Sequence, residues 1–83
     1  MAEKKTYKPL DELLEASGMR YEAIAERMGI TYDVFYKLRK YPDRISAIRL
    51  GQMSEATGID FLQLMDVVKK FSQELDILKR KAS

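Results

Sequence analysis

Glycines divide this chain into short segments in which apolar residues recur three or four positions apart. In the first segment Leu10 and Leu14 share a helical face, and Gly18 follows where a helix would end. Gly29 and Gly58 end two further segments of the same kind. No stretch shows the alternation of β-branched and polar residues that is typical of a strand. The pattern predicts an all-α domain of five helices with short connections.

Capping residues separate the later helices. Thr31 and Ser46 are suitable N-caps for the third and fourth helices, and Asp60 can cap the fifth. Residues 41–43, Tyr-Pro-Asp, predict a turn, because the residue before a proline is disfavoured in the helical conformation. The apolar residues expected to face the interior are Val34, Phe35 and Leu38 in the third helix and Ile48, Leu50, Met53 and Ala56 in the fourth.

The composition excludes several classes of protein. The chain has 83 residues, room for one small domain, and no cysteine or histidine, so the usual thiolate and imidazole metal ligands and the commonest general base are absent. No apolar run approaches the roughly 18 residues that a membrane span needs, and the first ten residues lack the apolar stretch of a secretory signal. We expect a cytoplasmic protein that is not an enzyme and needs no metal or cofactor.

Charge is distributed unevenly along the chain. The net charge is only +2, but residues 9–36 carry two basic against six acidic residues. Residues 37–49 carry five basic residues against one acidic residue, and Lys4, Lys5 and Lys8 precede the first helix. A local basic cluster of this kind is what contact with nucleic-acid phosphates requires, although it also fits a solvated face.

The segment from Arg20 to Leu38 predicts a helix-turn-helix. Ala25 is small where two crossing helices must approach closely, and Gly29 lies at the turn, where positive φ is needed. Phe35 and Leu38 of the second motif helix would pack against the first. The face left uncovered would carry Tyr32, Asp33, Tyr36 and Lys37, with Arg39 and Lys40 at its end.

The stretch GMRYEAIAERMGITYDVFYKL, with ISAIRLGQMSEATGIDFLQLM after a polar loop, resembles the phage-repressor-like (lambda-repressor-like, xenobiotic-response-element) helix-turn-helix transcriptional regulators. The similarity extends from about Leu10 to Met65. It implies a five-helix fold, dimeric binding to DNA, and a recognition helix, residues 31–40, in the major groove. Members of the family often have glutamine where this chain has Tyr21.

The resemblance places the first residues of the recognition helix at base edges and nearby phosphates, and Tyr21 at the DNA backbone. The basic cluster adds phosphate contacts just after that helix. Together they predict DNA contacts by Tyr21, Thr31, Tyr32, Asp33, Tyr36, Lys37, Arg39, Lys40 and Arg44.

The last predicted helix carries a heptad pattern that runs past the family-like region. Its apolar residues, spaced alternately four and three apart, are Leu64, Val68, Phe71, Leu75 and Leu78. An apolar stripe of this length usually marks an interface, which predicts a homodimer formed through this helix, and the alternative is a helix folded back on its own domain.

These observations define one main hypothesis and one alternative. The first is a sequence-specific, double-stranded-DNA-binding transcriptional regulator, a repressor, with a flexible basic arm (1–8), a helix-turn-helix domain (9–65) and a C-terminal dimerisation helix (66–83). The alternative is a repressor-like protein-interaction module that does not bind DNA, such as an antitoxin or a mobile-element partner protein. Asp33 and Tyr21 favour the alternative, because an acid repels phosphates and a tyrosine replaces the family's amide only in part.

Overall fold

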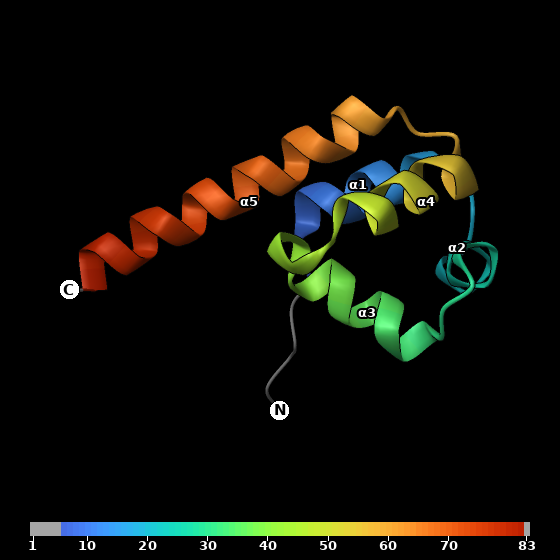
Figure 1. Ribbon diagram of the computed structural model, residues 1–83, viewed down its shortest axis with the longest axis horizontal. Helices are drawn as coiled ribbons and strands as arrows, with labels where there is room; N and C mark the ends of the chain where they lie inside the picture. The colour runs from blue at the N-terminus through green and yellow to red at the C-terminus, as the bar shows by residue number, and fades with distance from the viewer. Residues whose placement is uncertain (1–5, 83) are drawn as a thin grey trace.

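The computed structural model describes residues 6–82, with the side chains of residues 6–80. Its helices are α1 (Lys8–Ala16), α2 (Tyr21–Met28), α3 (Tyr32–Lys40), a 3₁₀ turn η1 (Pro42–Arg44), α4 (Ala47–Thr57) and α5 (Phe61–Ala82). The described part of the chain contains no strand. The prediction of an all-α, five-helix fold with a long last helix is confirmed. Helices α1 to α4 form the globular body, and the end of α5 projects beyond it (Figure 1).

The helix boundaries follow from the glycines and caps that the sequence predicts. Gly29 ends α2 at φ 76° and Gly58 ends α4 at φ 79°, in the left-handed region that side chains with a Cβ rarely adopt. The Thr31 side chain accepts a hydrogen bond from the Val34 backbone N–H at 3.2 Å, which caps α3. Ser46 caps α4 in the same way.

One apolar core joins all five helices. Phe35 of α3 is fully buried at its centre, and α2 packs against both α3 and α4. Burial of each large apolar side chain contributes about 1.5–3 kcal/mol. The other fully buried apolar side chains of similar size are Leu10, Leu14, Ile24, Leu50, Met53 and Leu64.

Two of the predicted core residues lie on the surface instead. Val34 is 39 % exposed and Ile48 is 78 % exposed, so the prediction that they face the interior is wrong. Each residue turns a helix by about 100°. In α4 the buried residues Leu50 and Met53 define one side, and Ile48 lies nearly opposite to it. In α3 the buried side is centred on Phe35 and Arg39, which are one turn apart, so Val34 points away from the core.

The first described residues belong to the folded body rather than to an arm. Lys8, the last residue of the predicted arm, begins α1, and Tyr7 packs against the core and precedes this helix as its N-cap. Lys4 and Lys5 of the predicted basic arm lie outside the described residues. None of the helices in the described chain has the length and apolarity that crossing a membrane requires.

Candidate nucleic-acid interface

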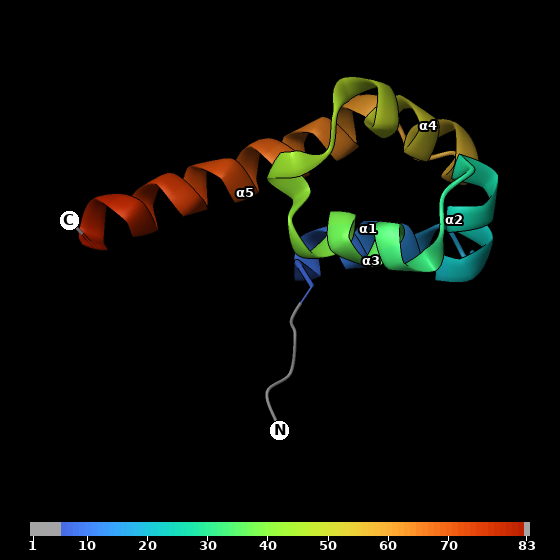
Figure 2. The same ribbon diagram turned by 60° about the horizontal axis from the view of Figure 1, so that its bottom comes forward.

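Helices α2 and α3 form the predicted helix-turn-helix. The turn is closed by a hydrogen bond from the Ile30 N–H to the Ala25 carbonyl at 3.0 Å, just after the left-handed Gly29. Ile24, Ala25 and Met28 on α2 are buried with Phe35. The packing fixes α3 with one side in the core and the opposite side at the surface. Figure 2 shows α3 at the edge of the globular body.

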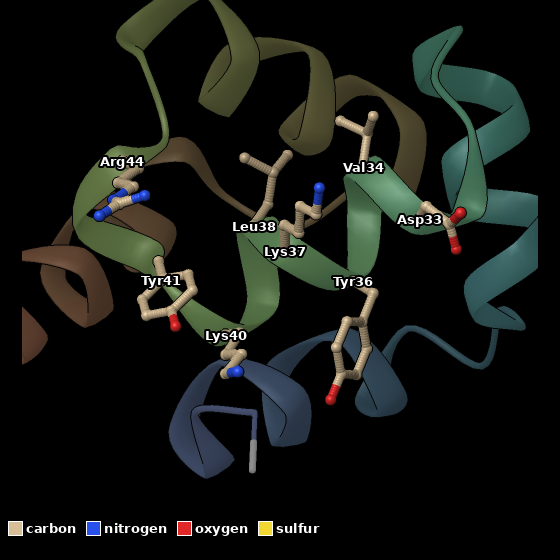
Figure 3. A pocket seen from close by; sticks show the side chains of 8 residues that line it. All are labelled: Asp33, Val34, Tyr36, Lys37, Leu38, Lys40, Tyr41 and Arg44. Atoms are coloured by element: carbon tan, nitrogen blue, oxygen red, sulfur yellow. The ribbon is translucent and has the colours of Figure 1, made fainter. Parts of the chain in front are cut away.

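The surface side of α3 carries three charged residues in line. Asp33, Lys37 and Lys40 are spaced four and three apart, so they follow one another along a single face. Asp33 and Lys37 are exposed, and Lys40 is half-buried. These residues line a surface hollow of about 720 Å³. Figure 3 shows Lys37 near its middle, with Asp33 near the start of α3 and Lys40 at the other end.

An aromatic residue, Tyr41, and basic residues on either side of it in the sequence close the far end of this hollow. The Tyr41 ring lies between two cations, with the Arg44 Cζ 4.8 Å and the Lys40 Nζ 5.3 Å from its centroid. Cation–π attraction holds both charges near the end of α3 despite their mutual repulsion. The prediction of a basic cluster did not include Tyr41. The sequence does place this aromatic residue between the cations Lys40 and Arg44, which is the pattern that could have predicted its role.

Arg39 does not take part in this surface. Its side chain is buried, 6 % exposed for the residue, and its Nε donates to the Asp11 Oδ1 at 2.9 Å. Its guanidinium also stacks on the Tyr21 ring, 3.7 Å from the centroid. Burial by itself would lower the pKa of Arg39, but the hydrogen bond and charge of Asp11 outweigh it and raise the pKa. The prediction that Arg39 faces DNA is wrong, because Arg39 lies one turn after Phe35 on the buried side of α3.

Tyr21 belongs to the same internal cluster. Its hydroxyl donates to the Glu15 Oε2 at 2.5 Å, and its ring contacts both the Arg39 guanidinium and the Phe35 ring, with the two ring centroids 6.0 Å apart. One ring face and the hydroxyl proton are therefore engaged within the protein. The structure gives Tyr21 a supporting position beneath α3, whereas the family resemblance predicts a contact with the DNA backbone. Burial, followed by the hydrogen bond to Glu15, raises the pKa of Tyr21.

The raised pKa of Tyr21 predicts a loss of stability at alkaline pH. In the unfolded chain tyrosine ionises near pH 10, whereas folded Tyr21 keeps its proton to higher pH. The contribution is therefore fully present below about pH 10 and is lost as pH rises through the folded pKa. We expect the urea midpoint to fall less between pH 9 and pH 11 in Tyr21→Phe than in the unaltered protein. Equal pH dependence in both proteins would contradict this assignment.

The remaining predicted DNA contacts are distributed around the hollow. Thr31 caps α3 and is exposed, and Tyr32 is exposed and helps to raise the pKa of Arg39. Tyr36 is half-buried and lines the hollow with Val34 and Leu38. The structure thus brings together five of the predicted residues: Asp33, Tyr36, Lys37, Lys40 and Arg44. Val34 was missed because it was assigned to the core.

The predicted dimer seam is divided along α5. Leu64 is fully buried in the core of its own domain, so the prediction that it contacts a second chain is wrong. Val68 packs against the same core, and Phe71 packs edge-on against Tyr7 with ring centroids 4.8 Å apart. Leu75 is half-buried, and Leu78 is 62 % exposed. The fold-back alternative therefore describes the first half of the seam.

Among the described residues no group of three or more His, Cys, Asp or Glu side chains could hold a metal ion. The charged residues of the hollow come from one helix and the turn after it. This arrangement leaves one side of α3 uncovered, with Lys37 and Lys40 along it.

The fold is that of an all-α helix-turn-helix domain. A family model described as the Cro/C1-type HTH DNA-binding domain matches residues 9–70, three-quarters of the chain, and the chain belongs to this family. The family resemblance seen in the sequence is thereby confirmed. No curated protein and no solved structure matches the chain.

Proposed function

We propose that the protein is a sequence-specific transcriptional regulator that inserts α3 into the major groove of duplex DNA. The uncovered outer face of α3 carries the proposal. A major groove about 12 Å wide admits one α-helix, and α3 has its opposite side anchored in the core by Phe35 and Arg39. We propose repression as its effect, because occupancy of an operator excludes polymerase from the same DNA.

The charged line on α3 divides into base-reading and phosphate-binding parts. Asp33 and Lys37 lie on the first two turns, where a helix in the groove meets base edges. A carboxylate can accept a hydrogen bond from the cytosine amino group, and an ammonium can donate to guanine O6 and N7. The exposed Val34 methyl groups offer an apolar contact for a thymine methyl. Asp33 is thus compatible with DNA binding as a specificity residue, although it repels phosphates.

Lys40 and Arg44 are placed for phosphates. Both lie beside the Tyr41 ring at the end of α3. In the proposed complex the helix leaves the major groove at this end, close to the DNA backbone. Phosphate contacts position a protein on DNA without selecting sequence.

We further propose that two chains bind together through the distal part of α5. Ile77 and Leu78 are 51 % and 62 % exposed beyond the part that the core covers. Burial of such side chains contributes about 1.5–3 kcal/mol each, which several from each chain could set against the entropy of association. A twofold dimer would place its two recognition helices about 34 Å apart, one turn of DNA.

Salt dependence of DNA binding tests the proposal. Each phosphate contact contributes about 0.9 to the slope of log affinity against log salt concentration. The double variant Lys40→Ala, Arg44→Ala is expected to flatten that slope by about 1.8 on random and preferred duplexes alike. The preferred duplex is obtained by selection from a random pool at about 150 mM salt.

The matched control is the double variant Lys69→Ala, Lys70→Ala. It removes the same charge from exposed positions on α5. Its slope should stay close to that of the unaltered protein. Equal slopes in all three proteins would overturn the phosphate assignment. An absence of salt-dependent binding to any duplex would favour the protein-interaction module instead.

A further inference from the structure

Tyr7 contacts two helices that are far apart in the sequence. Its backbone N–H donates to the Arg39 carbonyl near the end of α3 at 2.9 Å. Its ring packs edge-on against Phe71 of α5, with centroids 4.8 Å apart and planes at 68°. Its hydroxyl donates to the Glu74 Oε2, one turn further along α5, at 3.2 Å. One residue therefore joins the end of the recognition helix to the middle of α5.

Tyr7 is itself held firmly in place. Its carbonyl accepts a hydrogen bond from the Asp11 N–H at 3.1 Å, which fixes it at the start of α1. Asp11 in turn binds the Arg39 side chain. Tyr7 and Asp11 together therefore hold this end of α3, one through the backbone and the other through the side chain of Arg39. A side chain anchored in this way can transmit the position of α3 to whatever it touches.

The contact on α5 lies where the helix leaves the body. At about 1.5 Å per residue the 22 residues of α5 extend about 33 Å. Leu64 and Val68 hold its first part against the core, whereas Ile77 and Leu78 lie beyond it. Figures 1 and 2 both show this last part projecting away from α1 to α4. Phe71 and Glu74 lie between the held part and the projecting part.

The chemistry of the contact is directional. An edge-on aromatic pair and a hydrogen bond to a carboxylate each prefer one geometry, unlike general apolar packing. Burial of Tyr7, followed by its hydrogen bond to Glu74, raises the pKa of its phenol. The pair of contacts therefore favours one direction of α5.

We infer that Tyr7 is a positioning residue that fixes the angle between α3 and the projecting part of α5. The consequence for DNA rests on the function proposed above. In a dimer joined through the distal part of α5, this angle sets the distance between the two recognition helices. Tyr7 would then determine which half-site spacing the dimer accepts, without touching DNA.

A distance measurement tests the angle without DNA. The chain has no cysteine, so cysteines introduced at the exposed positions Lys37 and Asp76 are the sole attachment points for two spin labels. Double electron–electron resonance, with labelled chains diluted in unlabelled protein, reports the distance within one chain. We expect one narrow distribution in otherwise unaltered protein and a broader or shifted one in Tyr7→Ala. Leu62→Ala, an exposed position at the start of α5, should leave it narrow.

A second pair of variants guards against unfolding. Tyr7→Phe removes the bond to Glu74 but keeps the ring, and Glu74→Ala removes the acceptor at an exposed position. Both should keep the helical circular dichroism of the unaltered protein. Both should also broaden the distance distribution to the same extent as each other, and less than Tyr7→Ala does. A distribution that is the same in all these variants as in the unaltered protein would overturn the positioning role.

The spacing of half-sites tests the consequence for DNA. The selected inverted repeat is compared with versions whose half-sites are one base pair closer or further apart. The unaltered dimer should bind one spacing more tightly than the others. The affinities of Tyr7→Ala for the differently spaced duplexes should agree with one another to within about threefold, because the distance between the recognition helices is no longer fixed. Binding to a single half-site should be unchanged. A purely structural role would weaken binding to every duplex alike, and an unchanged spacing preference would overturn the inference. If the unaltered protein binds no DNA, the proposed function fails, and the spin-label distances still decide the role of Tyr7.

Discussion

Replacing Asp11 with alanine is expected to lower the free energy of unfolding by about 3 kcal/mol. Asp11 and Arg39 form a 2.9 Å ion pair whose side chains are only 16 % and 8 % exposed. Without the carboxylate, the guanidinium would stay buried with no opposite charge beside it. Urea denaturation at neutral pH, followed by circular dichroism, measures the loss.

The neighbouring Glu12 provides a matched control for this prediction. It is an acid on the same helix but is exposed, so Glu12→Ala should change the free energy of unfolding by less than about 0.5 kcal/mol. The apolar pair Asp11→Leu, Arg39→Met should recover much of the loss, because neither charge then remains buried. If Asp11→Ala proves as stable as Glu12→Ala, the ion pair does not hold α1 to α3.

Leu78→Asp is expected to convert the proposed dimer to a folded monomer and to lower the affinity for an inverted repeat by about 10²–10⁴-fold. That range is the gain from linking two binding modules, which a monomer loses. Leu78 is exposed, so an acid there should leave the helical core intact. Sedimentation at tens of micromolar protein and binding to the selected duplex measure the two effects. Leu75 is a less suitable position, because its side chain is already half-buried within its own chain.

Leu62→Asp makes the same chemical change at the other end of α5. Leu62 is 68 % exposed, so the two variants add an equal charge at positions of similar exposure. Leu62→Asp should remain dimeric and keep most of its affinity for the inverted repeat. If the unaltered protein is a monomer, or if both variants behave alike, the paired half-sites proposed here are wrong.

The sequence by itself predicted the helices and their boundaries. The left-handed glycines and the caps Thr31 and Ser46 act over a few residues, so their effect can be read without knowing the fold. The helix-turn-helix followed from the same local signals, and with it the outward line of Asp33, Lys37 and Lys40.

Tertiary structure alone decided which residues beside each apolar face are buried and which charges are used internally. Arg39 stands in a run of basic residues and has no local mark that separates it from Lys37 and Lys40. It is buried because Asp11, 28 residues away, supplies the opposite charge that makes burial of a guanidinium tolerable. Tyr21 and the first half of the α5 seam likewise pack against residues from distant segments of the chain. Helical periodicity fixes which residues share a face, whereas the choice between core and surface depends on what other helices place against that face.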